Sequence, residues 1–305
     1  MKEFQEFLTD IIEHKDLRIE YLTNAGPRII SLHFQDINLF AQIPDVKVNT
    51  PNGIYRFLGG HRLWTAPENL ATTYYPDDTP PEINVSNKNE VLLKGKRNKI
   101  SGIEKSMSIR LDPDHPSVRI DHTISNFGEE SITLAPWSLT QLVMNGFAIL
   151  PQETKPVDDA GYLPNRNLIL WPYTRWQDDR IHFRDDFYLI KAKPKNQALK
   201  IGYMNTHGWM AYVLQNIIFC KTFFPKPDEL HPDLNSNSEA YVKDQFIELE
   251  TLGPLVSLEP GKKTIHTEIW DLFVLEEPMV SIEQVKDVES FLLNSISDRD
   301  LLRTT

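Results

Sequence analysis

The 305-residue chain is poor in cysteine and in positive charge. Its one cysteine, Cys220, excludes an intramolecular disulfide and a zinc site made of cysteines alone, and it fits a reducing compartment. The 32 basic and 43 acidic residues give a formal net charge of −11, which argues against a general nucleic-acid binder and against an anionic membrane surface. No apolar run approaches the ~20 residues of a membrane-spanning helix, and residues 1–7 carry acids where a signal peptide is apolar. We therefore expect a cytoplasmic protein that binds neither nucleic acid nor membrane.

Glycine is scarce as well, with 13 glycines against 21 prolines, which favours short strands joined by stiff connections. Apolar and polar residues alternate over 17–21, 107–111 and 118–124, as in half-buried strands. Residues 209–224 are interpreted as one further strand, and the proline-rich region 65–90 as a long irregular loop. Helical spacing is confined to the C-terminal segment, where Ser281 and Gln284 form a capping box. The sequence thus predicts one all-β domain over 1–305, a large antiparallel β-sandwich, with a C-terminal helix over 281–296.

Segment 57–68 carries the side chains of a site for a polar ligand. A double glycine, which lets the backbone approach a ligand closely, precedes His61, Arg62, Trp64 and Glu68. An indole stacks on the apolar face of a sugar ring, while imidazole, guanidinium and carboxylate groups hydrogen-bond its hydroxyls. The alternative is a turn with a buried tryptophan and an Arg–Glu pair on the surface.

Further candidates lie on predicted strands. Trp137 is either a stacking platform or a core residue. Glu248 and Glu250 share one strand face; we interpret Glu248 as solvent-exposed and Glu250, at the strand end, as a candidate site residue. Lys200 and Lys221 lie among apolar residues, so each ammonium group either reaches the surface or points into a carbohydrate or phosphate pocket.

His122, on an apolar strand face, is interpreted as a core histidine. The chain contains no glycine-rich nucleotide motif, no Gly-x-Ser-x-Gly and no His-Glu-x-x-His. The sequence therefore argues against the enzyme classes that these three motifs mark.

Three passages, in this order, resemble the galactose mutarotase-like (aldose 1-epimerase-like) superfamily. The first is the Gly-Gly-His-Arg-Leu-Trp signature at 59–64, which is typical of one branch. The second is the strand, turn and strand over 118–140. The third is the strand over 248–268 with its Leu-Glu-Pro-Gly finish. The resemblance spans about 17–275 and implies a large antiparallel β-sandwich, in agreement with the alternation of residues.

The resemblance also implies an activity: interconversion of the anomers of a hexose by acid–base ring opening, without a cofactor or a metal. The family's glutamate base corresponds to Glu250. The position of its histidine acid falls on Trp137, and since an indole cannot serve as that acid, His61 becomes the candidate. The expected substrate-binding residues are Arg62, Trp64, Glu68, Trp137, Lys200 and Lys221.

Two other functions remain open on the same fold. One is a carbohydrate-binding protein that has lost the catalytic acid. The other is a lyase or glycosidase that uses Glu68 and Glu250. In each case the expected partner is a small carbohydrate, and the protein is a monomer or a homodimer.

Overall fold

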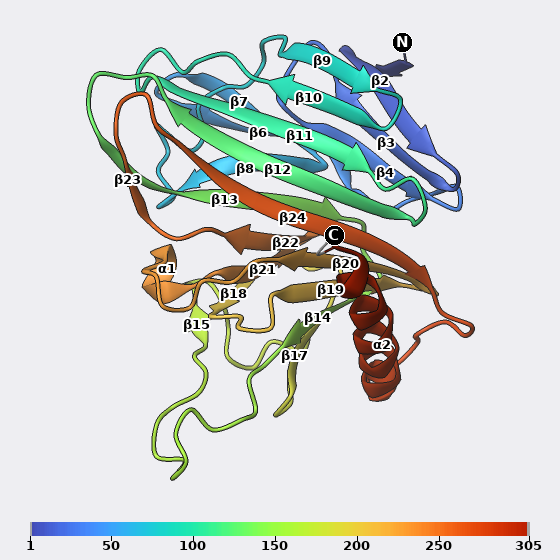
Figure 1. Ribbon diagram of the computed structural model, residues 1–305. Coiled ribbons are helices and arrows are strands. Elements are labelled where there is room, and N and C mark those ends of the chain that lie inside the picture. Colours follow the sequence, from blue (N-terminus) through green and yellow to red (C-terminus); the bar gives the residue numbers. More distant parts are fainter. Residues whose placement is uncertain (1, 304–305) are drawn as a thin grey trace.

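Two large antiparallel sheets lie face to face in the computed structural model, which describes residues 2–303 and the side chains of 4–295 (Figure 1). The larger sheet contains, in spatial order, β1 (Lys2–Phe4), β2 (Phe7–His14), β3 (Leu17–Leu22), β4 (Ile29–Phe34), β8 (His61–Ala66), β13 (Ile132–Leu142), β22 (Phe246–Leu252), β21 (Ser238–Lys243), β18 (Leu199–Tyr203) and β15 (Ile169–Leu170). At its margins β5 (Ile37–Asn38) pairs with β4, and β23 (Val256–Leu258) pairs with β13.

The smaller sheet contains β16 (Ile181–Phe183), β17 (Phe187–Lys191), β14 (Phe147–Pro151), β19 (Trp209–Leu214), β20 (Ile217–Phe223), β24 (Lys263–Val274), β12 (Ser117–Asn126), β11 (Ile103–Leu111), β10 (Glu90–Lys94) and β9 (Glu82–Asn87). A separate hairpin is made of β6 (Gln42–Thr50) and β7 (Gly53–Gly59). The helical segments are α1 (Pro232–Asn235), the 3-10 turn η1 (Ile282–Gln284) and α2 (Val285–Arg303).

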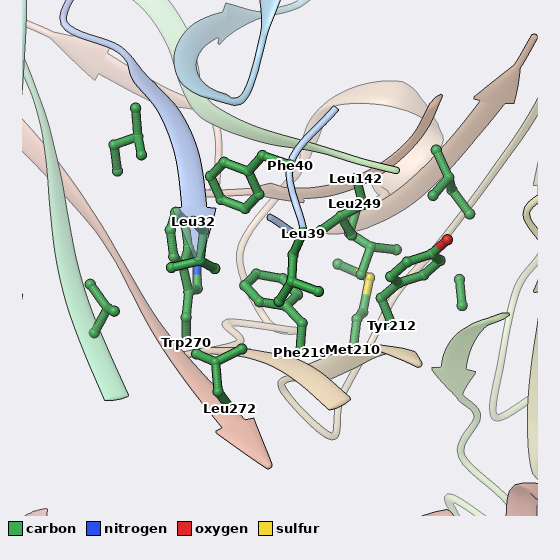
Figure 2. Packing of buried hydrophobic residues seen from close by; sticks show 14 of the residues in the cluster. Leu32, Leu39, Phe40, Leu142, Met210, Tyr212, Phe219, Leu249, Trp270 and Leu272 are labelled. Carbon is green, nitrogen blue, oxygen red and sulfur yellow. The ribbon is translucent and has the colours of Figure 1, made fainter. Parts of the chain in front are cut away.

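The main core lies between the two sheets. Figure 2 shows where the chain around Phe40 meets the smaller sheet. The ring of Phe40 lies edge-on to Phe219 and Trp270, with centroids 6.4 and 5.6 Å away. Full burial of such a side chain contributes about 1.5–3 kcal/mol, so this interior holds the sheets together.

Helix α2 covers the outer face of the smaller sheet. Val285, Val288 and Leu292 are buried in a second apolar cluster with residues of β14, β17, β19 and β20. The capping box of Ser281 and Gln284 is present, as expected. The side chain of Ile296, the last of the expected helical repeat, lies outside the described residues. Among the described residues, no helix combines the length and apolarity required to cross a bilayer.

The antiparallel sandwich and its C-terminal helix agree with the sequence prediction, while several local predictions were wrong. The segment expected to be one strand over 209–224 is a hairpin of β19 and β20, which turns at Gln215 with φ of 56°. The region 65–90, expected to be irregular, ends in β9. The turn at Gln215 and Asn216 contains no glycine or proline and so hid the first boundary, while the prolines up to Pro81 obscured the strand that begins at Glu82.

Candidate functional site

A cleft of about 590 Å³ opens on the outer face of the larger sheet. Strands β8, β13, β22, β21 and β18 form its floor, and the β6–β7 hairpin and two long loops form its walls. Its aromatic lining consists of Phe57, Trp64, Tyr74, Trp137, Trp171, Tyr173, Tyr241 and Phe246. Its charged lining consists of Arg62, Lys200, Lys243, Glu68, Asp244, Glu248 and Glu250. Such a surface combines flat apolar walls with a few polar groups, as small-molecule sites do.

Glu250 lies on the cleft floor with a fully buried side chain. Its Oε2 accepts hydrogen bonds from Trp137 Nε1 at 2.7 Å and from Lys200 Nζ at 2.9 Å. Its Oε1 has no hydrogen-bond partner among the described residues. One carboxylate oxygen is thus fixed in place while the other is free to accept a proton or a hydrogen bond.

Lys200 is buried beside Glu250 and does not extend its ammonium group to the surface. Its Nζ lies 2.7 Å from Glu239 Oε2 and 4.7 Å from each of the ring centroids of Trp137 and Trp171. Burial lowers the pKa of Lys200, but Glu239 and Glu250 outweigh this effect and hold it well above its usual range. Burial likewise raises the pKa of Glu239 well above its usual range, against the opposing effect of Lys200. Two carboxyl groups therefore share one ammonium ion beneath the cleft.

Glu248, which the sequence interpretation placed in solvent, is 6% exposed and lines the cleft. Arg62 Nη2 donates a hydrogen bond to its Oε1 at 3.0 Å. Burial raises the pKa of Glu248 to about 7, although Arg62 lowers it, and the nearby Glu250 raises it further. Glu248 can therefore carry a proton near neutral pH, which an ordinary surface glutamate cannot.

The aromatic wall is interlocked. The Trp64 ring lies 4.7 Å from Tyr74 and 5.3 Å from Trp137, and the Arg62 guanidinium lies 4.3 Å above it. The Tyr74 hydroxyl donates a hydrogen bond to Glu68 Oε1 at the rim. These contacts hold the cleft in shape because each ring is fixed by at least one neighbour.

His61 does not line the cleft, so the expected acid–base pair with Glu250 across one pocket is not present. Adjacent residues of a strand point to opposite faces, and β8 therefore sends Arg62 into the cleft and His61 between the sheets. There His61 Nε2 lies 2.7 Å from His122 Nε2, and its Nδ1 lies 2.8 Å from Thr140 Oγ1. Burial lowers the pKa of His61 well below its usual range.

Lys221 is also absent from the cleft. Its ammonium group lies 3.0 Å from Glu268 Oε1 and donates to the carbonyl of Leu249 at 3.0 Å, and both charged side chains are fully buried. Glu268 also accepts hydrogen bonds from Ser138 and Thr251. Lys221 and Glu268 thus form the ion pair of a buried network beneath the cleft. This network contacts β22 through the carbonyl of Leu249 and the hydroxyl of Thr251.

His61, His122 and Glu268 place one ligand atom each within 4.8 Å of one another. The arrangement does not fit a metal ion well. The two Nε2 atoms are at hydrogen-bond distance, closer than the roughly 3.3 Å that separates two tetrahedral zinc ligands at usual bond lengths. Lys221 already supplies the positive charge opposite Glu268. His122 is fully buried and hydrogen-bonded, as a core histidine should be.

Of the residues expected from the sequence, the structure gathers Arg62, Trp64, Glu68, Trp137, Lys200 and Glu250 in one cleft. Sequence reasoning missed Glu239, Tyr74 and Trp171. Glu239 lies on β21, a strand that had not been predicted, and it pairs directly with Glu250. The alternation that places Glu248 and Glu250 on one strand face was the available signal that Glu248 also lies in the cleft.

No protein-family model matches the chain, and no curated protein matches it in sequence. Solved structures match it in fold. A candidate aldose 1-epimerase from Escherichia coli K12 superposes with a TM-score of 0.55 at 12% identity, covering 88% of this chain and 100% of that one. A protein from Synechocystis sp. PCC 6803 gives a TM-score of 0.55 at 13% identity, with 90% and 100% coverage. A candidate mutarotase from Salmonella typhimurium gives 0.57 at 11% identity, with 90% and 93% coverage.

Proposed function

Starting from a chain that has the galactose mutarotase-like fold, we propose that its aromatic cleft binds a sugar and catalyses aldose 1-epimerase-type ring opening. The observation that carries the proposal is the pair Glu248 and Glu250 on one strand face inside that cleft. Residues two apart on a strand are separated by roughly 7 Å along it, a span comparable to a pyranose ring. The pair can therefore reach two positions of one sugar.

The two carboxyl groups differ in the way that the reaction requires. Glu250, with its free Oε1, is the base that takes the proton of the anomeric hydroxyl. Glu248, whose pKa burial raises to about 7, is the acid that gives its proton to the ring oxygen. General acid and general base each contribute about 10²–10⁴-fold to a rate. In this proposal Glu248 takes the role that His61 was expected to fill.

The bonds change as follows. As the anomeric hydroxyl loses its proton to Glu250, the bond between the anomeric carbon and the ring oxygen breaks, and the ring oxygen takes the proton of Glu248. The open-chain aldehyde turns about the adjacent carbon–carbon bond. Its hydroxyl then adds to the other face of the carbonyl while both protons return. No atom is gained or lost, so no cofactor is required.

A second candidate function is sugar binding without catalysis. Two contacts on Glu250 Oε2, from Trp137 and Lys200, favour it, because they tie this carboxylate to the floor of the cleft, as in a residue that shapes a binding site. In addition, no histidine of the described residues lines the cleft.

Polarimetry of freshly dissolved aldoses, with wild type, Glu250→Gln and the exposed control Glu259→Gln, tests the proposal. We expect wild type and Glu259→Gln to accelerate the equilibration of at least one aldose and Glu250→Gln not to. Titration calorimetry with the same sugars accompanies it. Binding without acceleration for every sugar would favour the second function, and neither binding nor acceleration would overturn both.

A further inference from the structure

A second cleft, of about 990 Å³, lies beside the first and shares Glu68 with it. Residues of the loop over 65–79 and of the segment over 95–105 line it. Apolar side chains, among them Ile54, Ile132 and Leu134, also line it. We call it the basic cleft, because Lys96, Arg97, Lys99 and Lys105 all face it from one segment. Its volume is at the upper end of the range for small-molecule sites.

Lys105 occupies an unusual position in this cleft. On β11 it alternates with the buried residues Ile103 and Met107, so it stands where the strand pattern calls for an apolar residue. Its side chain is half-buried there. Within the described part of the chain, Lys105 Nζ has neither a hydrogen bond nor an ion pair. An inward-facing amine that opens into a cleft is a feature of a ligand site.

The fold brings the rest of the basic segment to the same place. Gly95 donates its N–H to the carbonyl of Lys105 at 2.9 Å, which folds the segment back on β11. A Cβ at Gly95 would lie 2.6 Å from Pro27 Cδ, so this close approach requires glycine. The guanidinium of Arg97 lies 4.5 Å above the ring of Phe127. Arg97 is thus held beside the cleft.

The charges of the cleft are unbalanced in favour of cations. Among its acidic residues, Asp77 forms an ion pair with Arg28 at 2.7 Å, and Glu68 accepts the hydrogen bond of Tyr74. Asp78 is the one remaining acid of the lining. In the part of the chain that the structure describes, none of the four cations forms an ion pair with an acid. The protein as a whole carries −11, so this cluster runs against its average charge.

The environment of Lys105 agrees with this imbalance. Burial lowers the pKa of Lys105 to about 8; Asp77 raises it, and Arg28 and Arg62 lower it. An anion beside the amine would offset both the burial and the neighbouring guanidinium groups.

We propose that the basic cleft is a binding site for a small organic molecule that carries a phosphate or sulfate ester. The oxyanion group lies against Lys105 and the cations of the rim, and the organic body lies against the apolar wall of Ile54, Ile132 and Leu134. The proposal does not rest on the sugar proposed for the first cleft, although the two clefts share Glu68.

Competitive lysine acetylation tests the proposal on the intact protein. Methyl acetyl phosphate is an anionic acetyl donor, and an N-hydroxysuccinimide ester of acetate is a neutral one. In both cases the lysine nitrogen attacks the acetyl carbon, the leaving group departs with its oxygen, and the amine proton passes to solvent. Peptide mass spectrometry gives the rates at Lys105 and at the exposed control Lys263.

We expect the anionic donor to acetylate Lys105 about tenfold or more faster than Lys263, because clustered charge concentrates counter-ions by that order. With the neutral donor the ratio of the two rates should be about tenfold or more smaller, because only the lowered pKa of Lys105 then favours it. Inorganic phosphate or sulfate should slow the reaction at Lys105 only, and the more effective of the two identifies the ester. The double variant Lys96→Ser/Lys99→Ser should lose the preference for the anionic donor.

Equal preference for Lys105 with both donors would mean a reactive amine without an anion site and would overturn the proposal. So would equal rates at Lys105 and Lys263 with the anionic donor, or no protection by either anion. The thermal unfolding of the double variant, which changes two exposed side chains, checks that the fold is intact.

Discussion

The pKa of Glu248 makes the stability of the protein depend on pH in a way that one substitution removes. Burial raises this pKa from 4.5 to about 7, so between these values the folded protein holds a proton that the unfolded chain has released. The resulting stabilisation is fully present below pH 4.5 and is lost as the pH rises through 7. Since each unit of pKa difference corresponds to 1.36 kcal/mol, the loss amounts to about 3 kcal/mol.

Glu248→Gln cannot ionise and keeps an oxygen for Arg62. We therefore expect the free energy of unfolding of the variant, relative to wild type, to rise by about 3 kcal/mol from pH 4.5 to 8. Urea unfolding of wild type, Glu248→Gln and the exposed control Glu259→Gln at several pH values measures it. The difference from wild type should stay constant for the control. A constant difference for Glu248→Gln as well would show that Glu248 ionises normally and would refute this reasoning.

Three further substitutions distinguish the role of a cleft residue from the roles of residues in the buried network. Trp137→Phe removes the donor to Glu250 Oε2 and part of the stacking surface, so sugar affinity measured by calorimetry should fall about tenfold; unchanged affinity would place the sugar elsewhere. His61→Gln should lower the free energy of unfolding by about 1–3 kcal/mol and leave sugar affinity intact, and the reverse pattern would make His61 a cleft residue. Lys221→Met leaves Glu268 buried without its counter-charge, so urea unfolding should show a loss of about 3–5 kcal/mol; a small loss would mean that the hydrogen bonds to Glu268 suffice.

The sequence predicted the architecture because the strands carry a strong signal. Alternation over 118–124, for example, corresponds to β12, which is buried on its inner face. The β6–β7 hairpin carried no such signal: most of β6 alternates between half-buried and exposed residues, because this hairpin stands outside both large sheets.

The site was predictable where neighbouring residues on one strand set its geometry, and not where distant strands meet. Arg62 and Trp64 share the cleft because alternation puts them on one face of β8. The same alternation places His61 on the opposite face of β8, and this separation could have been predicted from the sequence. The pairing of Glu239 with Glu250 depends on the register of β21 against β22, and no local pattern reveals that register.

Exchange NMR between the two anomers of an aldose, in the presence of the protein, tests the role of the paired carboxyl groups most directly. It measures interconversion at equilibrium. With the aldose that equilibrates fastest, wild type and Glu259→Gln should accelerate the exchange, with a rate that falls above pH 7 as Glu248 loses its proton. Glu250→Gln and Glu248→Gln should each abolish most of the acceleration. Exchange that is equally fast in all four proteins would contradict the assignment of Glu250 as base and Glu248 as acid.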